Sequence, residues 1–393
     1  MIPFSPPSIT EEDIEAVVEV LRSGWITTGP VGQRFEQALA AYCGTERVVA
    51  LNSATAALEL ALRAVGAGPG DEVIVPAYTY TASASVIDHV GATIVMVDTE
   101  PGAPIPSPER IAAAVTQRTR AIITVDLAGI PYDSRPLHDL LAGRGRIDEG
   151  LPHALGRPAI ISDAAHSLGA RLADLASGQI ADMTAFSFHA VKNLTTAEGG
   201  ALTWRADLPV DHDELARSIR VLALHGQTKD ALAKSQGSSW EYDIVSPAYK
   251  ANMPDVLAAI GLSQLGRYEQ IVARRLELVD RYASGLEGSG VELLHHSVPG
   301  QRSSAHLAIA SLPVDGPAER NRVIQDLYEA GVSANVHYKP LSLLTAYRNL
   351  GFSPDQHPHA HGFYSTELTL PLHVLLTDQD VDQVCSALVD ALA

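Results

Sequence analysis

The chain has 393 residues, of which 46% are hydrophobic and 19% charged, and its formal net charge is −18. This acidic balance argues against a protein that binds the phosphate backbone of nucleic acids, and the apolar content argues against a disordered chain. The acidic start does not have the pattern of a signal peptide, and no apolar run approaches the ~18 residues of a membrane-spanning helix. With only two distant cysteines, Cys43 and Cys385, we expect a cytoplasmic protein without a disulfide framework.

The N-terminal segment is predicted to form a helix that ends at Ser23-Gly24. Its apolar residues recur at i, i+3, i+4 and i+7, a spacing that places Ile14, Val17, Val18 and Leu21 on one side. A turn-rich loop, "GWITTGPVGQRFE", then leads into a second helix.

From about residue 48 to 205, short apolar strands alternate with helices. The predicted strands are "RVVALNS", "EVIVP", "TIVMVD", "AIITVDL", "PAIISD" and "MTAFSF". Strands made almost entirely of Val, Ile, Ala and Leu are buried on both faces, as in a parallel sheet covered by helices. Ligands of such sheets bind beyond the carboxyl ends of the strands.

The regular alternation of strands and helices ends after "YKANMP". Residues 255–285 are predicted to form one long helix, followed by strands at "HLAIASLP" and "VSANVHY". The last helix opens with Thr377 three residues before Asp380, a capping-box pattern, and buries Val381, Val384, Cys385 and Leu388. We therefore expect a large α/β domain over residues 1–250, which includes the N-terminal helix, and a smaller α+β domain over residues 251–393.

Three segments at predicted strand ends carry polar groups. "NSAT" places Ser53, Ala54 and Thr55 at a helix start, where free N–H groups can bind an anion, although simple capping by Ser53 or Thr55 is the more common role. No glycine-rich P-loop or G-x-G-x-x-G follows any strand. Asp163 ends a predicted buried strand, where an unpaired carboxylate is costly, and His166 follows it.

Lys192 lies just past the strand "MTAFSF", in a loop rich in polar side chains. Lysines usually lie on the surface, but a partly desolvated lysine has a lowered pKa and can attack a carbonyl to form a Schiff base. A strand-end aspartate with a downstream lysine suits pyridoxal 5′-phosphate (PLP), whose ring nitrogen needs a carboxylate and whose aldehyde needs an amine.

With these residues the chain resembles the DegT/DnrJ/EryC1/StrS family of PLP-dependent nucleotide-sugar aminotransferases, which have fold type I. The resemblance runs through "SGWITTGPVGQRFE", "NSATAALELAL", "GDEVIVPAYTYTASA", "DAAHSLGA", "SFHAVKNLTTAEGGAL", "YKANMPDVLAAIGLSQL" and "NVHYKPL". It implies a large domain with a mostly parallel mixed sheet and a smaller C-terminal α+β domain. It also implies PLP as the cofactor, with the pyridoxamine form (PMP) during turnover.

The resemblance assigns roles to individual residues. Lys192 matches the lysine that binds the cofactor and carries protons, and Asp163 matches the carboxylate that keeps the pyridine nitrogen protonated. Tyr80 matches the aromatic residue that stacks on the ring, and His166 replaces a common glutamine near the ring oxygen. The phosphate would be held by Ser53, Ala54, Thr55 and Ser187, and by Asn252 of a neighbouring subunit, which implies a homodimer with shared active sites. The sugar-nucleotide pocket would include Trp25, Thr27, Lys250, His337 and Tyr338.

The resemblance therefore predicts an aminotransferase that moves an amino group, with L-glutamate as the expected donor, to a nucleotide-linked 4-keto-6-deoxy sugar. Residues 224–255 look most like members that make 4-amino sugars. Three alternatives stay open: amination at C3, a PLP/PMP-dependent sugar dehydratase, and a non-catalytic regulator. Dehydratase variants of the family carry histidine in place of the lysine, and the acidic chain has no DNA-binding appendage, so both of the latter are disfavoured.

Three alternating histidines, His357, His359 and His361, raise the question of a metal site. Prolines are close by and carboxylates or cysteines are not, so a flexible loop near the substrate entrance is the preferred prediction, and no metal is expected.

Overall fold

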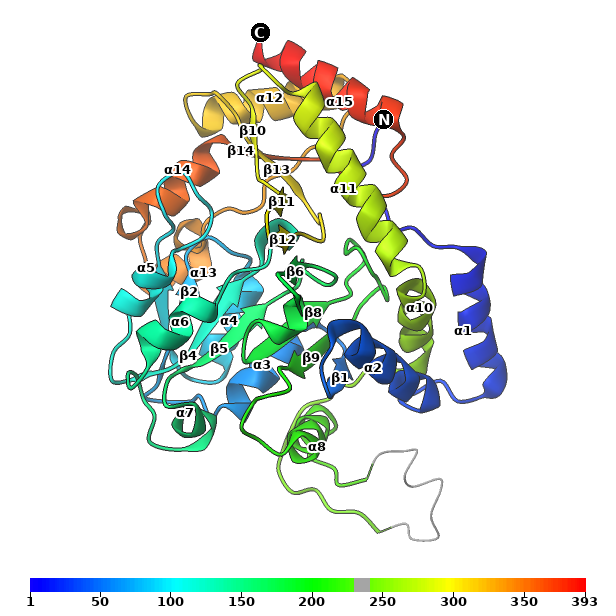
Figure 1. The fold of residues 1–393 in the computed structure, drawn as a ribbon, viewed down its shortest axis with the longest axis vertical. Helices are drawn as coiled ribbons and strands as arrows, with labels where there is room; N and C mark the ends of the chain where they lie inside the picture. The colour runs from blue at the N-terminus through cyan, green and yellow to red at the C-terminus, as the bar shows by residue number, and fades with distance from the viewer. Residues whose placement is uncertain (230–240) are drawn as a thin grey trace.

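The computed structural model describes residues 1–229 and 241–393, and a seven-stranded sheet forms its centre (Figure 1). The strand order is β1-β9-β8-β5-β4-β2-β3. Pairing is parallel from β3 to β8, whereas β9 is antiparallel to both of its neighbours. The expected mostly parallel mixed sheet is therefore confirmed. Its strands are β1 (Val48–Leu51), β2 (Glu72–Pro76), β3 (Thr93–Val97), β4 (Thr119–Val125), β5 (Ala159–Asp163), β8 (Met183–Ser187) and β9 (Gly200–Trp204).

Helices cover both faces of this sheet because alternate strand residues point to opposite sides. In β4, Ala121 and Ile123 pack into one core and Ile122 into the other. The first core contains residues of α3 (Ala54–Ala64), α4 (Thr81–His89), α7 (Gly150–Leu155) and α8 (His212–Ala223). The opposite face is covered by α2 (Pro30–Cys43), α5 (Pro108–Ala113), α6 (Arg135–Leu141), α10 (Asp255–Leu265) and α11 (Tyr268–Gly285).

The C-terminal part packs its own apolar core around a second sheet, in the order β10-β13-β14. Its strands are β10 (Glu292–Leu293), β13 (Ala308–Ser311) and β14 (Glu367–Leu370), and its helices include α12 (Pro317–Glu329) and α15 (Asp378–Leu392). The capping box of Thr377 with Asp380 and the buried stripe of α15 are as predicted. The chain's start joins this part, since Ile2 N donates to Gly331 O over 2.7 Å. The domain boundary at residue 250 stays a prediction.

A third, small sheet has the order β11-β12-β6-β7 and links the two parts. Its two-residue strands are β6 (Arg171–Leu172), β7 (Leu175–Ala176), β11 (Ser297–Val298) and β12 (Gln301–Arg302).

Two predicted elements were wrong. The segment 255–285 is not one helix, because Arg267 leaves the helical region (φ −116°, ψ 10°) after the poor helix former Gly266 and so separates α10 from α11. The segment "VSANVHY" is not a strand but makes only isolated bridges, from Val332 to Ile2 and from Asn335 to Thr369. No segment in the described part of the chain pairs with it continuously.

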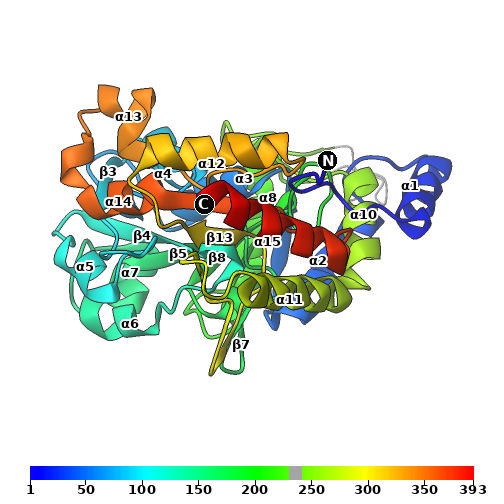
Figure 2. The same cartoon turned by 90° about the horizontal axis from the view of Figure 1, so that it is seen from above.

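The first helix was predicted correctly as α1 (Glu11–Ser23), but its apolar stripe is not the buried side. Ile14 and Leu21 are 47% and 55% exposed, whereas Asp13 and Val20 are buried. Asp13 is buried because it pairs with Arg267 over 2.6 Å at the junction of α10 and α11. Seen from above, α1 lies at the periphery beside α10 (Figure 2).

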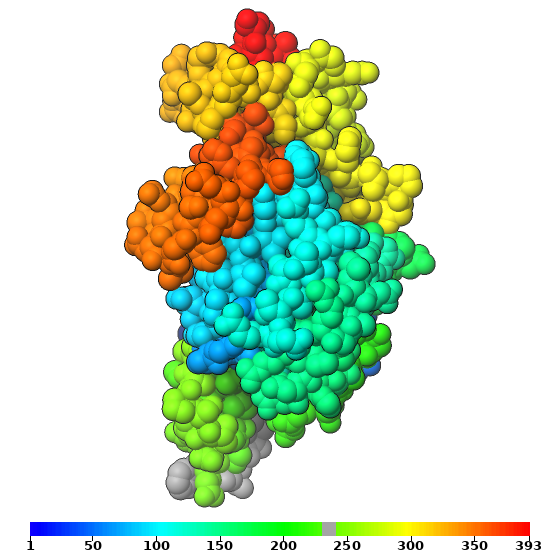
Figure 3. All heavy atoms as spheres, turned by 90° about the vertical axis from the view of Figure 1, so that its left-hand side faces the viewer, coloured from blue at the N-terminus to red at the C-terminus, as the bar shows by residue number. Residues whose placement is uncertain are grey.

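The histidine segment is helical rather than a flexible loop, which corrects that prediction. Helix α14 (Pro358–Thr366) begins with proline at its first position, where the missing N–H costs nothing. Its amides at His359 and Ala360 donate to the carboxylate of Asp98, which follows β3. In the space-filling view the orange segment with α13 (Thr345–Asn349) and α14 lies against the cyan segment (Figure 3). Within residues 1–229 and 241–393, no three metal-binding side chains gather as a metal site.

Part of one predicted segment lies outside the described residues. The stretch 224–255, on which the expectation of a 4-amino sugar product rests, includes residues 230–240. Among the helices of the described part, none is long and apolar enough to cross a bilayer.

The start of β9 passes unusually close to the start of α3, and this contact gives a first prediction. A Cβ on Gly200 would lie 2.3 Å from the carbonyl carbon of Ser53 and 2.4 Å from the amide nitrogen of Ala54. We expect Gly200→Ala to lower the free energy of unfolding by about 1–3 kcal/mol, as measured by urea denaturation, because the backbone must move apart.

Gly362→Ala is the matched control, since nothing lies within 4 Å of a Cβ at this helical position. It should stabilise the chain by roughly 0.5–1 kcal/mol through the helix preference of alanine. Equal stability of the Gly200→Ala variant and the wild type would contradict the close contact.

Candidate functional site

A cavity of about 350 Å³ opens at the carboxyl edge of the large sheet. β5 ends at Asp163, β8 ends at Ser187, and β1 leads into the start of α3, so residues distant in sequence meet there. Ten of the predicted site residues line it: Ser53, Ala54, Thr55, Tyr80, Asp163, His166, Ser187, Lys192, His337 and Tyr338.

Lys192 occupies a turn after β8, and its amide donates to His189 O over 2.9 Å. Its Nζ makes no hydrogen bond to any residue of the described chain. Burial lowers the pKa of Lys192 to about 8, and the carboxylate of Asp163 offsets part of that shift. A large share of the side chain is therefore a neutral amine at mildly alkaline pH.

Asp163 is a buried carboxylate that accepts from two neutral donors among the described residues. Ser83 Oγ donates to Oδ2 over 2.6 Å, and the amide of Ala165 donates to Oδ1 over 3.2 Å. Burial raises the pKa of Asp163, while these donors and Lys192 counteract the rise. A cationic N–H group of a ligand is the partner that such a carboxylate lacks.

The start of α3 forms an anion cradle. Ser53 caps the helix, since its Oγ accepts from the amide of Ala56 over 3.1 Å, so the capping role is the one observed for Ser53. The amides of Ala54 and Thr55, at the first two helical positions, have no partner within the helix. The close approach of Gly200 holds this backbone in place.

His166 and Tyr338 form a hydrogen-bonded pair whose direction follows from the backbone. The amide of Ala128 donates to His166 Nδ1 over 3.3 Å, so Nδ1 must be the acceptor. Burial holds the pKa of His166 well below its usual value, so the neutral ring carries its proton on Nε2 and donates it to Tyr338 Oη, 3.0 Å away. The phenol hydrogen of Tyr338 is then free to donate into the cavity.

Tyr80 stands at the mouth of the cavity. Its side chain is 58% exposed, and its ring centroid lies 5.6 Å from that of Tyr338. An exposed aromatic face beside a cavity is available for stacking on a flat ligand.

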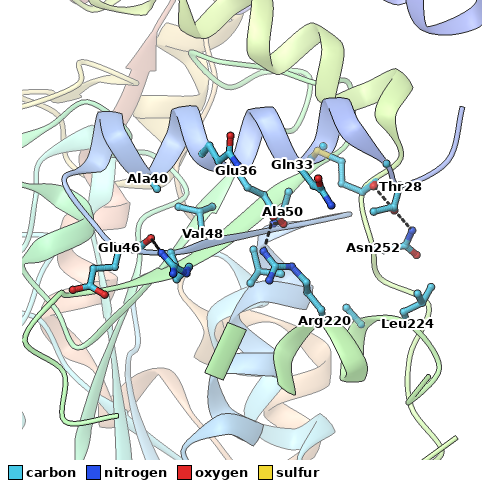
Figure 4. A pocket seen from close by; sticks show the side chains of 17 residues that line it. Thr28, Gln33, Glu36, Ala40, Glu46, Val48, Ala50, Arg220, Leu224 and Asn252 are labelled. Atoms are coloured by element: carbon cyan, nitrogen blue, oxygen red, sulfur yellow. Dashed lines mark hydrogen bonds and ion pairs between the residues drawn. The ribbon is translucent and has the colours of Figure 1, made fainter. Parts of the chain in front are cut away.

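Four other predicted residues do not line this cavity. Asn252 lines a separate cavity of about 550 Å³ between α2, β1 and α8 (Figure 4), where its Nδ2 donates to Thr28 Oγ1 over 2.6 Å. Lys250 donates to Asn252 Oδ1. Trp25 Nε1 donates to Thr28 O over 3.1 Å, and the carbonyl of Thr27 accepts from the amide of Asp255.

The sequence analysis missed Ser83, His306 and Gly200. Ser83 lies in the first turn of a helix that follows a strand end, a position that could have marked it. The double glycine at 199–200 was a signal of close backbone approach. His306, whose ring centroid is 4.4 Å from that of His166, comes from the C-terminal part and had no local signal.

Comparison with known proteins gives consistent results. Residues 7–389 match the DegT/DnrJ/EryC1/StrS aminotransferase family. The spore coat polysaccharide biosynthesis protein SpsC of Bacillus subtilis (strain 168) is 38% identical over 99% of this chain and 96% of its own.

Solved structures are similar over the whole chain. The PMP form of Spr1654 from Streptococcus pneumoniae, provisionally named a sugar aminotransferase, has a TM-score of 0.97 and 51% identity, covering 100% of this chain and 99% of its own. Its PLP form has a TM-score of 0.95, with 49% identity over 100% and 98% of the two chains. PseC of Helicobacter pylori, an aminotransferase involved in the biosynthesis of pseudoaminic acid, has a TM-score of 0.88 and 26% identity over 100% and 99%.

The lowered pKa of Lys192 predicts how its reactivity depends on pH. Only the neutral amine attacks an aldehyde, and the neutral fraction rises as the pH passes about 8, whereas an ordinary lysine would need a pH near 10.5. The rate at which the PLP-free protein takes up PLP, trapped by borohydride, should therefore rise with an inflection near pH 8. An inflection close to pH 10 would contradict the buried environment of this amine.

Proposed function

Because the chain belongs to the DegT/DnrJ/EryC1/StrS aminotransferase family, we propose that it transfers an amino group from L-glutamate to a nucleotide-linked 4-keto-6-deoxy sugar, giving a 4-amino sugar. The chain is a PLP-dependent sugar aminotransferase. The observation that carries the proposal is that Lys192 and Asp163 line one cavity together with the start of α3.

The residues of this cavity fit PLP. The free amides of Ala54 and Thr55 at a helix start suit the phosphate, with Ser187 nearby. The buried carboxylate of Asp163 suits a protonated pyridine nitrogen, and Tyr80 offers a face for stacking on the ring. PLP supplies an aldehyde that accepts an amine and a ring that withdraws electrons.

The chain's own groups would then have distinct tasks. Lys192 supplies the amine, and once released it can take up or give a proton because its pKa of about 8 is near neutrality. In its ionised form, Asp163 would hold a proton on the pyridine nitrogen of bound PLP. His166 and Tyr338 direct a phenol hydrogen into the cavity, where it can bind a developing negative charge.

The substrate proposal is supported by resemblance. Residues 224–255 look most like members that make 4-amino sugars. SpsC is named for spore coat polysaccharide biosynthesis and PseC for pseudoaminic acid biosynthesis, which supports an amino sugar destined for a surface glycan.

The separation of the two cavities supports a homodimer. Asn252 lines a cavity that does not contain Lys192, so its contact with the phosphate would be made to the cofactor of a second copy. Ile244 and Val245, in the segment that precedes Asn252, are 47% and 60% exposed. Exposed aliphatic side chains in this segment suit an interface between copies.

The activity can be tested directly with purified protein. With PLP and L-glutamate, the wild type should aminate a 4-keto-6-deoxy sugar nucleotide, detected by mass spectrometry, and 3-keto sugar nucleotides should react more slowly. Lys192→Ala should lower the rate at least about 100-fold, the lower end of what a positioned proton-transfer group contributes. Absence of an aminated product from every keto-sugar nucleotide would refute the proposal.

Subunit mixing tests the shared site. Lys192→Ala and Asn252→Ala should each be inactive or nearly so as homodimers. Refolding them together in equal amounts should restore about a quarter of the activity of the same amount of wild type. Half of the dimers are then mixed, and each mixed dimer has one intact site of two when Asn252 acts across the interface. No recovery would place Asn252 in the same site as the Lys192 of its own chain.

A further inference from the structure

Two residues outside the cavity wall, Glu367 and Thr369, lie directly behind His337. Both belong to β14 and are fully buried. Thr369 Oγ1 donates to Glu367 Oε1 over 2.6 Å, and His337 Nδ1 lies 3.0 Å from Thr369 Oγ1. The amide of His337 donates to the other carboxylate oxygen, Oε2, over 3.0 Å.

The direction of these hydrogen bonds follows from counting hydrogens. Burial raises the pKa of Glu367 to about 7, so at pH 8.5 the side chain is an ionised carboxylate that only accepts, and it takes the single hydroxyl hydrogen of Thr369. The oxygen of Thr369 can then only accept from His337, whose Nδ1 must carry the proton. The neutral imidazole is left with a lone pair on Nε2.

Nε2 of His337 makes no hydrogen bond to any residue of the described chain, and His337 lines the cavity together with Lys192. The ring is held from the side by Phe4, which stacks on it with centroids 5.5 Å apart and an angle of 17° between the planes. The neighbouring Tyr338 contributes the opposite polarity, because its phenol hydrogen is free to donate.

We propose that Glu367 and Thr369 are positioning residues that make His337 a hydrogen-bond acceptor for a hydroxyl group of the bound sugar. A hydroxyl can donate to His337 and accept from Tyr338 with the same oxygen, whereas an ammonium group can only donate. This inference rests on the proposed sugar substrate, and it adds that the pocket recognises the sugar through a fixed acceptor–donor pair.

The test removes the chain of hydrogen bonds from His337 through Thr369 to Glu367, called the relay below, without changing a residue of the cavity wall. Thr369→Val keeps the size of the side chain but loses the hydroxyl, and Thr369→Ser keeps the hydroxyl. At pH 8.5, Thr369→Val should raise KM for the keto-sugar nucleotide about two- to tenfold, the range of one neutral hydrogen bond, with little change in kcat or in KM for glutamate. Thr369→Ser should restore KM to near the wild-type value.

Thr99→Val is the matched control. Its hydroxyl is buried but has no hydrogen-bond partner among the described residues, so its loss should leave both KM values unchanged.

Glu367→Gln gives a second variant with a different mechanism. The amide of His337 needs the oxygen of the new side chain, so the NH2 group faces Thr369, which then donates to His337 Nδ1. The proton of the imidazole moves to Nε2 and the acceptor is lost. We expect the same rise in KM for the sugar, and weaker binding of the aminated sugar nucleotide by calorimetry.

The outcomes separate the two proposals. An unchanged KM for the sugar in folded Thr369→Val and Glu367→Gln enzymes that turn over overturns the relay alone. A rise in KM for glutamate instead would show that Nε2 meets the amino donor, which also overturns it. If the wild type neither binds nor aminates any sugar nucleotide, the proposed function fails, and this inference fails with it.

Discussion

The buried carboxylate of Asp163 is the constraint on which the rest of the cavity depends. It ends a central strand of the sheet, between β4 and β8, and is only 6% exposed where it meets the cavity. A negative charge in that place is stabilised only by partners brought to it, and the chain supplies one hydroxyl, one amide and the nearby ammonium of Lys192. The fold thus creates a site whose charge is incompletely matched by the protein and is suited to a cationic ring nitrogen.

The same burial acts on Lys192 with the opposite sign. Desolvation disfavours the charged form of both groups, raising the pKa of the acid and lowering that of the amine, while their mutual attraction opposes both shifts. The balance leaves Lys192 with a pKa of about 8, low enough for the amine to act as a nucleophile and high enough to hold a proton. Histidines 166 and 337 around it are held neutral by burial and by the lysine itself, so they act through hydrogen bonds of fixed direction rather than through charge.

Much of this arrangement could be predicted from the sequence because it is encoded locally. The strand–helix alternation placed Asp163, Ser187 and the start of α3 at one sheet edge, and the resemblance identified the residues that line it. Local patterns failed where distant contacts decide. Asp13 is buried only because Arg267 pairs with it across the chain, and α14 is helical partly because Asp98 caps it from another part of the fold. Neither partner is visible from the spacing of apolar residues.

The direction of a hydrogen bond is the property that is hardest to predict from a sequence. In this cavity it is set by residues behind the wall, which bond to the two histidines. A histidine in a motif carries two nitrogens, and its letter does not say which one holds the proton. For His166 the backbone amide of Ala128 decides, and for His337 the hydroxyl of Thr369 and the carboxylate of Glu367 decide. Those partners come from β14 and from the turn after β4, far from either histidine in the chain. Two adjacent residues, His337 and Tyr338, thereby present an acceptor and a donor to one cavity, and this polarity depends on residues that lie behind the cavity wall.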